Sequence, residues 1–183
     1  TDVSTTKPAF QSGGEHGQNI FAAVAAGMGQ LAIGTDAGGS IRIPACFAGI
    51  YGLKPTFGRV PMYPASPYGT LSHTGPMTRT VEDAALMLTV IAEPDARDWY
   101  GLPYDGTDYT KMLGSGIRGL KIGFSDNLGL DVNVSTEVAN AVSSASTIFT
   151  GLGATVEAVS VNWPTSPRDI FLVHFAAGAA TLM

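Results

Sequence analysis

A pair of adjacent glycines, Gly38 and Gly39, constrains the fold of this chain more than any other feature of its sequence. They follow the short apolar run 30–34, which has the length and composition of a buried strand, and they directly precede Ser40. Because glycine has no Cβ atom, two glycines let the backbone turn tightly, so that several N–H groups can point at one place beside the serine. The sequence therefore predicts a strand, a tight loop and a serine in this order.

This arrangement has a chemical and a structural interpretation. Fixed N–H donors that converge beside a hydroxyl group form an oxyanion hole, which stabilises the negative charge of a tetrahedral intermediate, and Ser40 could attack the same carbonyl carbon. Serine is also a favoured N-cap residue, so an isolated Gly-Gly-Ser more commonly marks a glycine turn followed by a helix. The three residues alone leave both interpretations open.

Three segments have the marks of helices. Residues 17–29 are rich in alanine and glycine, which suits a helix that packs close to a neighbour. Apolar residues recur at helical spacing over 80–92, and Thr80 stands at the expected N-cap. Ser135 is likewise placed to cap a helix over 135–150.

Short strands are expected between these helices. Their ranges are 30–34, 50–53, 120–124 and 154–161. Residues 55–78 and 95–118, which are rich in turn-forming and polar residues, are expected to be surface connections, and a last helix should begin near Pro167. Because strands and helices alternate, the sequence predicts an α/β fold with a mixed sheet flanked by helices.

The composition argues against several classes of function. Of the 183 residues, 45% are hydrophobic and 14% charged, the formal net charge is −5, and no cluster of Lys or Arg suggests a nucleic-acid partner. The apolar stretch 20–28 is too short to span a bilayer, so no membrane association is expected. The single cysteine, Cys46, excludes an internal disulfide and favours a reducing compartment, which we take as cytoplasmic.

Both ends of the chain resemble internal positions of a longer sequence. Residues 1–14 form a polar, turn-rich run without an apolar anchor. The chain stops at Met183 within an apolar run of helical character, without the glycine or basic last turn that ends many helices. We therefore expect the chain to be a piece of a longer protein.

The stretch 34–44 is accompanied by further motifs that occur in order and at matching separations. They lie at 22–27, 52–56, 58–60, 75–77, 79–85, 119–123 and 152–156. Together, from about residue 13 to residue 161, they closely resemble the amidase signature family. The resemblance implies that the protein hydrolyses or transfers amide groups, and sometimes ester groups, through a Ser–Ser–Lys triad without a metal or an organic cofactor.

The resemblance also assigns roles to individual residues. Ser40 matches the nucleophile, which would carry the acyl-enzyme formed from a small-molecule amide substrate. Ala37, Gly38 and Gly39 match the loop of the oxyanion hole, to which the N–H of Ser40 itself also belongs. The three histidines and one cysteine are too widely separated to indicate a metal site.

Charged residues flank this loop on both sides. Asp36 and Arg42 match charged positions of the family, and we expect them to be substantially buried and to support the loop by an ion pair or by hydrogen bonds to its backbone. Lys54 lies in a second family motif and is interpreted as a structural lysine rather than as the lysine of the triad.

Two catalytic groups of the family are not recognisable in this sequence. The catalytic lysine lies well upstream of the loop in the family, and Lys7 has no matching context. A gapless match back from Ser40 places His16 where the family has its bridging serine, and a shift of one residue offers only Glu15. His16 could be a surface histidine in a degenerate site, part of an altered segment, or a general base for Ser40 with Glu15 as its orienting partner.

Three functions are compatible with these observations. The chain could be part of a serine amidase, the amidase subunit of an amidotransferase complex, or a degenerate amidase-fold domain that binds or scaffolds without catalysis. We expect residues 1–183 to form part of one amidase-signature domain, with a motif core at about 13–92 and a further strand–helix–strand part at 119–161. The substrate identity and the oligomeric state are not indicated by the sequence.

Overall fold

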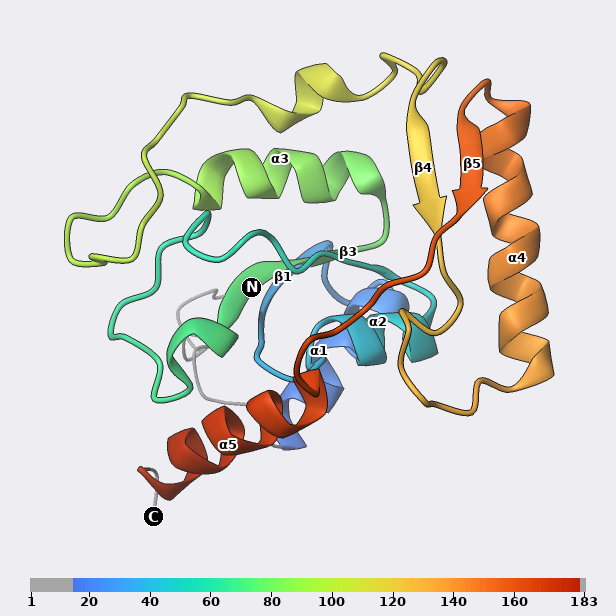
Figure 1. Cartoon of the computed structure of the whole chain (residues 1–183). Helices are drawn as coiled ribbons and strands as arrows, with labels where there is room; N and C mark the ends of the chain where they lie inside the picture. Colours follow the sequence, from blue (N-terminus) through green and yellow to red (C-terminus); the bar gives the residue numbers. More distant parts are fainter. Residues whose placement is uncertain (1–14, 182–183) are drawn as a thin grey trace. The chain divides into compact units, whose positions relative to one another are not determined.

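The computed structural model describes residues 15–181, with side chains from residue 20 onward (Figure 1). The chain divides into two compact units. One comprises the residues up to Met112 together with those from Phe171 onward, and the other comprises Leu113–Ile170. Helices and strands alternate along the chain, so the predicted α/β fold is confirmed.

A three-stranded antiparallel sheet forms the centre of the first unit. Its strand order is β1 (Leu31–Asp36), β3 (His73–Thr78), β2 (Tyr51–Gly52), so β3 is the middle strand (Figure 1). Every residue of β3 after His73 is buried, and the register places His73 opposite Asp36. Because β1 ends at Asp36, the sheet fixes the point from which the glycine loop departs.

Two helices flank this loop in the sequence. α1 (Glu15–Ala25) confirms the expected helix, but it ends at Ala25 rather than at residue 29, because Gly27 adopts a left-handed conformation with φ +76°. α2 (Arg42–Ala48) begins directly after the loop, and Gly49, which is also left-handed, caps its C-terminal end.

The third helix confirms its predicted cap. α3 (Val81–Ile91) begins after Thr80, whose side chain accepts a hydrogen bond from the Asp83 N–H at 3.1 Å. Ala84 and Leu88 on one face are buried, as the helical spacing of apolar residues predicts. Among the described residues of the same unit are the short 3-10 turns η2 (Gly69–Leu71) and η3 (Tyr109–Met112).

The core of the first unit lies next to the glycine loop. Ile41, the residue after Ser40, is 0% exposed, and Met77 of the middle strand is 2% exposed. Val24 of α1 and Leu88 of α3 belong to the same set of buried side chains. Burial of an isoleucine stabilises a fold by about 2 kcal/mol, so Ile41 anchors the far end of the loop in the core.

The expectation that residues 55–78 form a surface connection is wrong for its last part. His73–Thr78 is the buried middle strand β3, although it contains Gly75 and Pro76, which are unusual in strand interiors. Pro76 has no N–H to donate, but its carbonyl accepts the N–H of Leu53 at 3.0 Å. The Gly-Pro pair disfavours a strand locally, so the sequence did not indicate β3, which is stabilised by its pairing with the neighbouring strands.

The second unit is a parallel strand–helix–strand unit. β4 (Lys121–Phe124) and β5 (Thr155–Ala158) pair in parallel, and α4 (Thr136–Gly151) connects them. The Ser135 side chain accepts the N–H of Val138 at 3.4 Å, so the predicted helix, its cap and both strands are confirmed. Instead of one mixed sheet, residues 15–181 contain two separate sheets, because the parallel pair bonds to no strand of the three-stranded sheet.

The last helix, α5 (Pro167–Ala180), begins where the sequence predicts it. Proline suits a first helical position, since the N–H that it lacks would have no partner within the helix. From Phe171 onward the helix belongs to the first unit. Within residues 15–181, none of the helices has the length and apolar character needed to cross a membrane.

Candidate active site

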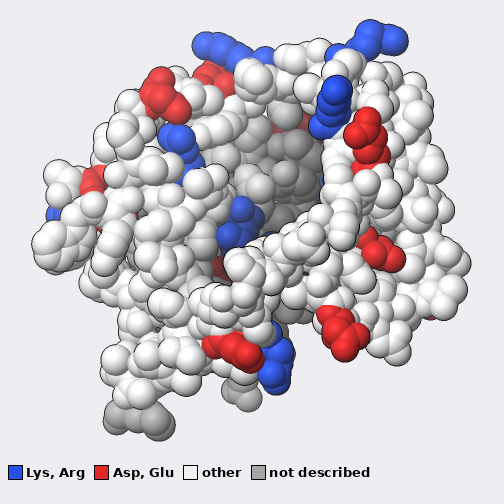
Figure 2. Space-filling view, viewed as in Figure 1, with Lys and Arg blue, Asp and Glu red and all other residues white. Residues whose placement is uncertain are grey.

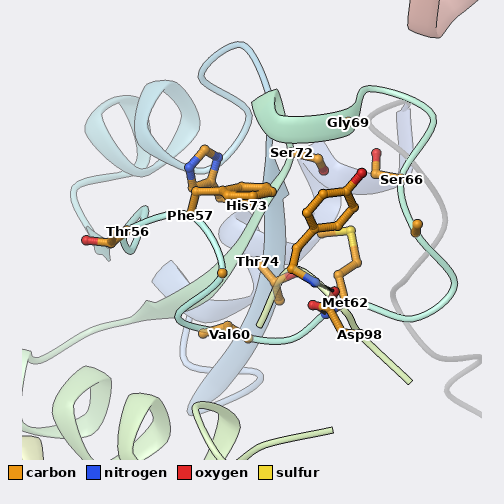
Figure 3. Close-up of a pocket in the computed structure, with 13 residues that line it drawn as sticks. Thr56, Phe57, Val60, Met62, Ser66, Gly69, Ser72, His73, Thr74 and Asp98 are labelled. Atoms are coloured by element: carbon orange, nitrogen blue, oxygen red, sulfur yellow. Dashed lines mark hydrogen bonds between the residues drawn. The ribbon is translucent and has the colours of Figure 1, made fainter. Parts of the chain in front are cut away.

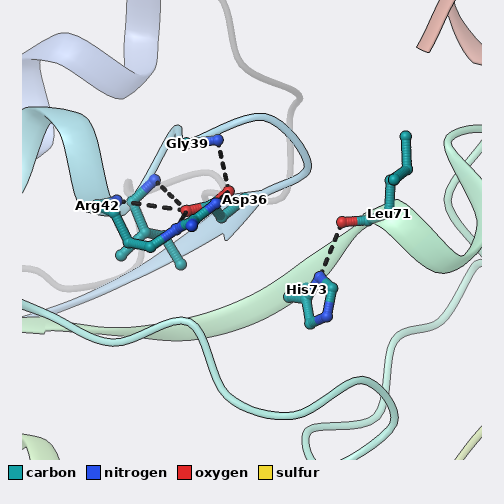
Figure 4. Close-up of polar contacts among 6 residues, drawn as sticks. Asp36, Gly39, Arg42, Leu71 and His73 are labelled. Atoms are coloured by element: carbon teal, nitrogen blue, oxygen red, sulfur yellow. Dashed lines mark hydrogen bonds and ion pairs between the residues drawn. The ribbon is translucent and has the colours of Figure 1, made fainter. Parts of the chain in front are cut away.

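A buried carboxylate organises the loop between β1 and α2. Asp36 is 0% exposed at the end of β1, and its Oδ1 accepts the N–H of Gly39 at 2.6 Å. Its Oδ2 accepts the N–H groups of Ile41 and Arg42, both at 3.3 Å. The loop therefore closes around this side chain, which Figure 4 shows beneath the backbone of Gly39.

The same carboxylate forms a two-pronged ion pair with Arg42. The Arg42 Nε donates to Oδ2 at 2.8 Å, and its Nη2 donates to Oδ1 at 3.0 Å (Figure 4). The predicted contact between Asp36 and Arg42 is confirmed. The expected burial is confirmed for Asp36 but is wrong for Arg42, whose side chain is 52% exposed, because the guanidinium reaches the carboxylate from the solvent side of α2.

The ion pair sets the protonation of both groups. Burial alone would raise the pKa of the Asp36 carboxyl, but the hydrogen bonds from Arg42 and from the Gly39 N–H outweigh it and lower the pKa below its ordinary value. The hydrogen bond to Asp36 raises the pKa of Arg42. Both groups are therefore charged at neutral pH.

Ser40 is exposed at the tip of this loop and does not serve as a helix cap. The N-cap position of α2 is Ile41, and no side chain of that residue type can cap the helix. The first N–H groups of α2 are instead accepted by Asp36, which lies six residues before the helix begins. The helix-cap interpretation of Ser40 is therefore wrong, and its hydroxyl is not used to stabilise α2.

The loop leaves a small group of N–H donors beside Ser40. Within the part of the chain that the structure describes, the N–H groups of Ala37, Gly38 and Ser40 have no acceptor. The Gly39 N–H is engaged by Asp36, so it is not available to a substrate. Gly39 has φ +112°, and a Cβ atom there would lie 2.5 Å from the Cδ1 of Ile43, so both its torsion and its surroundings require glycine.

Lys54 lies close enough to this ion pair to be affected by it. Partial burial, followed by the positive charge of Arg42, lowers the pKa of Lys54, and the charge of Asp36 opposes this shift. Lys54 forms no salt bridge with the described residues. Its role as a structural lysine stays a prediction.

The side chains that would supply a base are not placed by the structure. The backbone of Glu15 and His16 is part of the first turn of α1, but their side chains lie outside the described residues, as does Lys7. The side chain of His73, by contrast, is among the described residues, and its Nδ1 lies 2.8 Å from the Leu71 carbonyl oxygen (Figure 4). All three interpretations of His16 therefore remain predictions.

A small cavity borders His73 and Thr74 of the middle strand β3. Phe57, His73, Tyr100 and Thr74 contribute to its lining (Figure 3), and its volume is about 30 Å³. This volume suits water rather than an organic substrate. The Thr74 hydroxyl in its wall is buried and has no hydrogen-bond partner among the residues that the structure describes. The candidate nucleophile Ser40 is not among the residues that line this cavity.

One contact near Ser40 was not predicted from the sequence. Phe171 of α5 touches Gly38 in the loop, since a Cβ atom at Gly38 would lie 3.1 Å from the Phe171 Cζ. The two residues are far apart in the chain, and no local pattern relates them. Only the packing of α5 within the first unit shows that an aromatic ring borders the loop.

The distribution of charge and of possible metal ligands adds little to the description of the site. On the face shown in Figure 2, basic and acidic side chains are interspersed and form no large patch of one sign. Among residues 15–181, no group of three or more His, Cys, Asp or Glu side chains could hold a metal ion.

Comparisons with known proteins agree with this geometry. The Amidase family model matches residues 12–183. A glutamyl-tRNA(Gln) amidotransferase subunit from Staphylococcus saprophyticus is 45% identical over 159 residues, which cover 86% of this chain and 31% of the relative.

Solved structures give the same result. A bacterial aryl acylamidase of the amidase signature family superposes with a TM-score of 0.79 at 40% identity, over 88% of this chain and 33% of that one. A glutamyl-tRNA(Gln) amidotransferase subunit from Thermotoga maritima gives a TM-score of 0.75 at 30% identity, over 88% and 35%. The chain thus spans about a third of the length of these relatives. Because the family model covers nearly all of it and its fold matches that of solved members, this chain belongs to the amidase signature family.

Proposed function

We propose that the protein of which this chain forms part hydrolyses carbon–nitrogen amide bonds through an acyl-enzyme on Ser40. The observation that carries the proposal is the exposed Ser40 beside three N–H groups that the described residues leave unbonded, in a loop fixed by buried Asp36. Membership of the amidase signature family, and the similarity to an aryl acylamidase, support the same chemistry.

The mechanism follows from this arrangement. The Ser40 Oγ attacks the carbonyl carbon of the amide and gives up its proton to a base. The oxygen of the resulting tetrahedral intermediate accepts hydrogen bonds from N–H groups among those of Ala37, Gly38 and Ser40. Collapse of the intermediate expels the amine, which takes up a proton, and leaves an ester on Ser40. Water then hydrolyses the ester, releases the carboxylic acid and regenerates the serine.

The base is the least defined part of this mechanism. The resemblance implies a lysine that acts through a bridging serine, and the positions at which these are expected lie before residue 20. His16 is the alternative base, since an imidazole can accept a proton near neutral pH. The proposal needs only that one such group reaches the Ser40 hydroxyl.

A second candidate function is supported by the relatives. The name of the Staphylococcus saprophyticus protein favours an amidase subunit that releases ammonia for a partner protein. Glutamine, rather than an aryl amide, would then be the preferred substrate. A degenerate domain without catalysis is the third candidate, and the Glu15-His16 segment favours it.

Labelling with a fluorophosphonate tests the proposal. This reagent forms a stable adduct only with an activated serine, so we expect peptide mass spectrometry of the protein to find the adduct on Ser40. Ser40→Ala should abolish the labelling, whereas Ser144→Ala, on the exposed helix α4, should not change it. A protein that is folded but unlabelled at Ser40 would favour the degenerate domain. Faster turnover of glutamine than of acetanilide would favour the amidotransferase function.

A further inference from the structure

Hydrogen bonds hold the part of the loop that directly precedes Ser40. The N–H of Gly39 donates to the Asp36 carboxylate at 2.6 Å, which fixes the peptide group between Gly38 and Gly39. The carbonyl of Gly39 accepts the N–H of Ile43 at 2.8 Å, which fixes the next peptide group and with it the Ser40 N–H. The last two peptide groups before the serine are therefore anchored.

The peptide group between Ala37 and Gly38 has no such anchor. Among the residues that the structure describes, neither the Ala37 carbonyl nor the Gly38 N–H takes part in a hydrogen bond. Glycine also adopts more backbone conformations than other residues, so the torsions of Gly38 do not by themselves hold the group in one orientation. Packing is the interaction that is left to direct the Gly38 N–H, one of the proposed oxyanion donors.

An aromatic ring packs against this peptide group. A Cβ atom at Gly38 would lie 3.1 Å from the Cζ of Phe171 and 3.4 Å from its Cε2, so the ring edge leaves little room for a side chain there. Phe171 approaches the loop from α5 and belongs to the same compact unit as Ser40. The ring thus contacts the loop at the peptide group that hydrogen bonds leave unfixed.

Two neighbouring rings hold Phe171 in place. Its ring centroid lies 5.3 Å from that of Phe175, one turn later on α5, with an interplanar angle of 32°. Phe175 in turn stacks on Tyr68, with a centroid distance of 4.9 Å and an angle of 28°. The buried Gly178 brings the helix so close to Tyr68 that a Cβ atom at Gly178 would be 2.5 Å from the Tyr68 Cδ1. The position of the Phe171 ring is therefore fixed by packing along α5.

We propose that Phe171 is a positioning residue, whose ring holds the peptide group between Ala37 and Gly38 so that the Gly38 N–H stays directed at the carbonyl oxygen of the substrate. This inference rests on the proposed function and deepens it by naming a residue that acts through an oxyanion donor. Loss of one such donor slows catalysis by about 10²–10³-fold. A donor that is loosened rather than removed should cost less, about tenfold.

The first arm of the test measures how fast two reagents sulfonylate Ser40. Methanesulfonyl fluoride is small and aliphatic, and phenylmethylsulfonyl fluoride carries a ring. Phe171→Ala should slow both reactions about tenfold, and Phe171→Leu should slow them less, because the same donor serves the sulfonyl oxygen of either reagent. Val173→Ala, at a residue of α5 that is 71% exposed, should leave both rates unchanged. A fall confined to the aromatic reagent would mean that Phe171 binds the ring of the reagent, and it would overturn the proposal.

A double-mutant cycle separates this role from a general loss of stability. Gly38→Ala brings a methyl group against the Phe171 ring and should by itself slow the labelling of Ser40. In the Phe171→Ala background, where the ring is gone, the same substitution should have little further effect. Effects of the two substitutions that simply multiply would contradict a role that acts through their contact.

The second arm needs no catalysis and uses the Ser40→Ala protein, isotope-labelled at its glycine nitrogens. Nuclear magnetic resonance relaxation should give Gly38 an order parameter of about 0.85, as in rigid backbone, and a value below about 0.6 after Phe171→Ala. Gly39, whose N–H is bonded to Asp36, should stay rigid in both proteins. Equal order parameters of Gly38 with and without the ring would overturn the proposal. If methanesulfonyl fluoride failed to label Ser40 while Gly38 lost its order in Phe171→Ala, the proposed catalysis would be wrong and the hold of Phe171 on the peptide group would stand.

Discussion

At the scale of single residues, Asp36 accounts for most of the geometry around Ser40. Its pairing with Arg42 could be predicted, because two opposite charges flank a glycine loop in an otherwise apolar stretch. That the Gly39 N–H donates to Asp36, and so is not free to serve in the proposed oxyanion hole, could not be predicted. This hydrogen bond depends on the left-handed torsion of Gly39. A glycine in the sequence permits that torsion but does not specify it.

Replacement of Asp36 should therefore destabilise the protein in a pH-dependent way. Asp36→Asn keeps an acceptor but loses the charge, and we expect the free energy of unfolding to fall by about 2 kcal/mol at pH 7. Because the folded state lowers the pKa of Asp36 below 3.8, the carboxylate stabilises the protein fully above that pH and progressively less as the pH falls through the lowered pKa. Urea titrations at several pH values measure this.

The control for this prediction is an exposed ion pair. Asp95 pairs with Arg97 at the surface, and its pKa is lowered to about 2 chiefly by that hydrogen bond. Asp95→Asn should change the stability little at any pH, because solvent screens the pair. A difference between the parent and Asp36→Asn that did not shrink in acid would contradict the assigned role of the Asp36 charge.

Gly39→Ala tests the loop torsion itself. Alanine at φ +112° is strained, and its methyl group would meet the side chain of Ile43, so we expect a loss of about 1–3 kcal/mol in stability. The labelling of Ser40 should also slow by more than about tenfold, because the neighbouring N–H groups would be displaced. Gly29→Ala is the matched control, since that position has no heavy atom within 4 Å of an added Cβ atom. Equal effects of the two substitutions would refute this account.

At the scale of elements, local signals predicted four of the strands and the helices α1, α3, α4 and α5, but not the middle strand β3. Thr80 and Ser135 cap α3 and α4 as expected, because a cap is a contact between residues three apart and is written in the local sequence. β3 escaped prediction, because it is stabilised by pairing with β1 and β2 on both sides rather than by its own residues. Its Gly75-Pro76 pair carries the opposite local preference.

The cap of α3 gives a prediction at this scale. Thr80→Ala removes the acceptor for the Asp83 N–H and should lower the free energy of unfolding by about 1 kcal/mol. Thr80→Ser retains the hydroxyl and should lie near the parent. Thermal or urea unfolding followed by far-ultraviolet circular dichroism measures both variants. If Thr80→Ser were as destabilised as Thr80→Ala, the loss would come from packing of the threonine methyl group and not from the cap.

At the scale of the whole molecule, the family could be identified from the sequence, whereas the residues that surround the proposed nucleophile Ser40 could not. The motifs between residues 34 and 60 occur in order and at matching separations, and the stretch 34–44 is specific, so they identify the family without a structure. The contact of Phe171 with Gly38 joins segments at opposite ends of the chain, and nothing in either segment encodes it. The expected single amidase-signature domain stays a prediction, beside two compact units in the described structure.

The isolated 183-residue chain should show little amidase activity. Without an identified base, an oxyanion hole and substrate binding alone give about 10³–10⁴-fold acceleration over water, far below ordinary turnover of about 1–10³ per second. Hydrolysis of aryl amides by the chain, by Ser40→Ala and by His16→Ala measures this. Ordinary turnover that His16→Ala removed would establish a Ser–His pair. Ordinary turnover that only Ser40→Ala removed would require another base within the chain.

The carboxylate of Asp36 links the stability of the fold to the order of the loop around Ser40, two properties that are often separable in enzymes. It holds the first N–H groups of α2 and the turn at Gly39 together, so folding itself orders the loop. The conformational entropy of the loop is then lost once, when the protein folds, and not again each time a substrate binds. The proposed donors need no reorganisation when charge develops on a carbonyl oxygen. A substitution that loosened this loop to change the rate of catalysis would therefore also loosen the start of α2. The residue just before that helix, Ile41, is packed in the core.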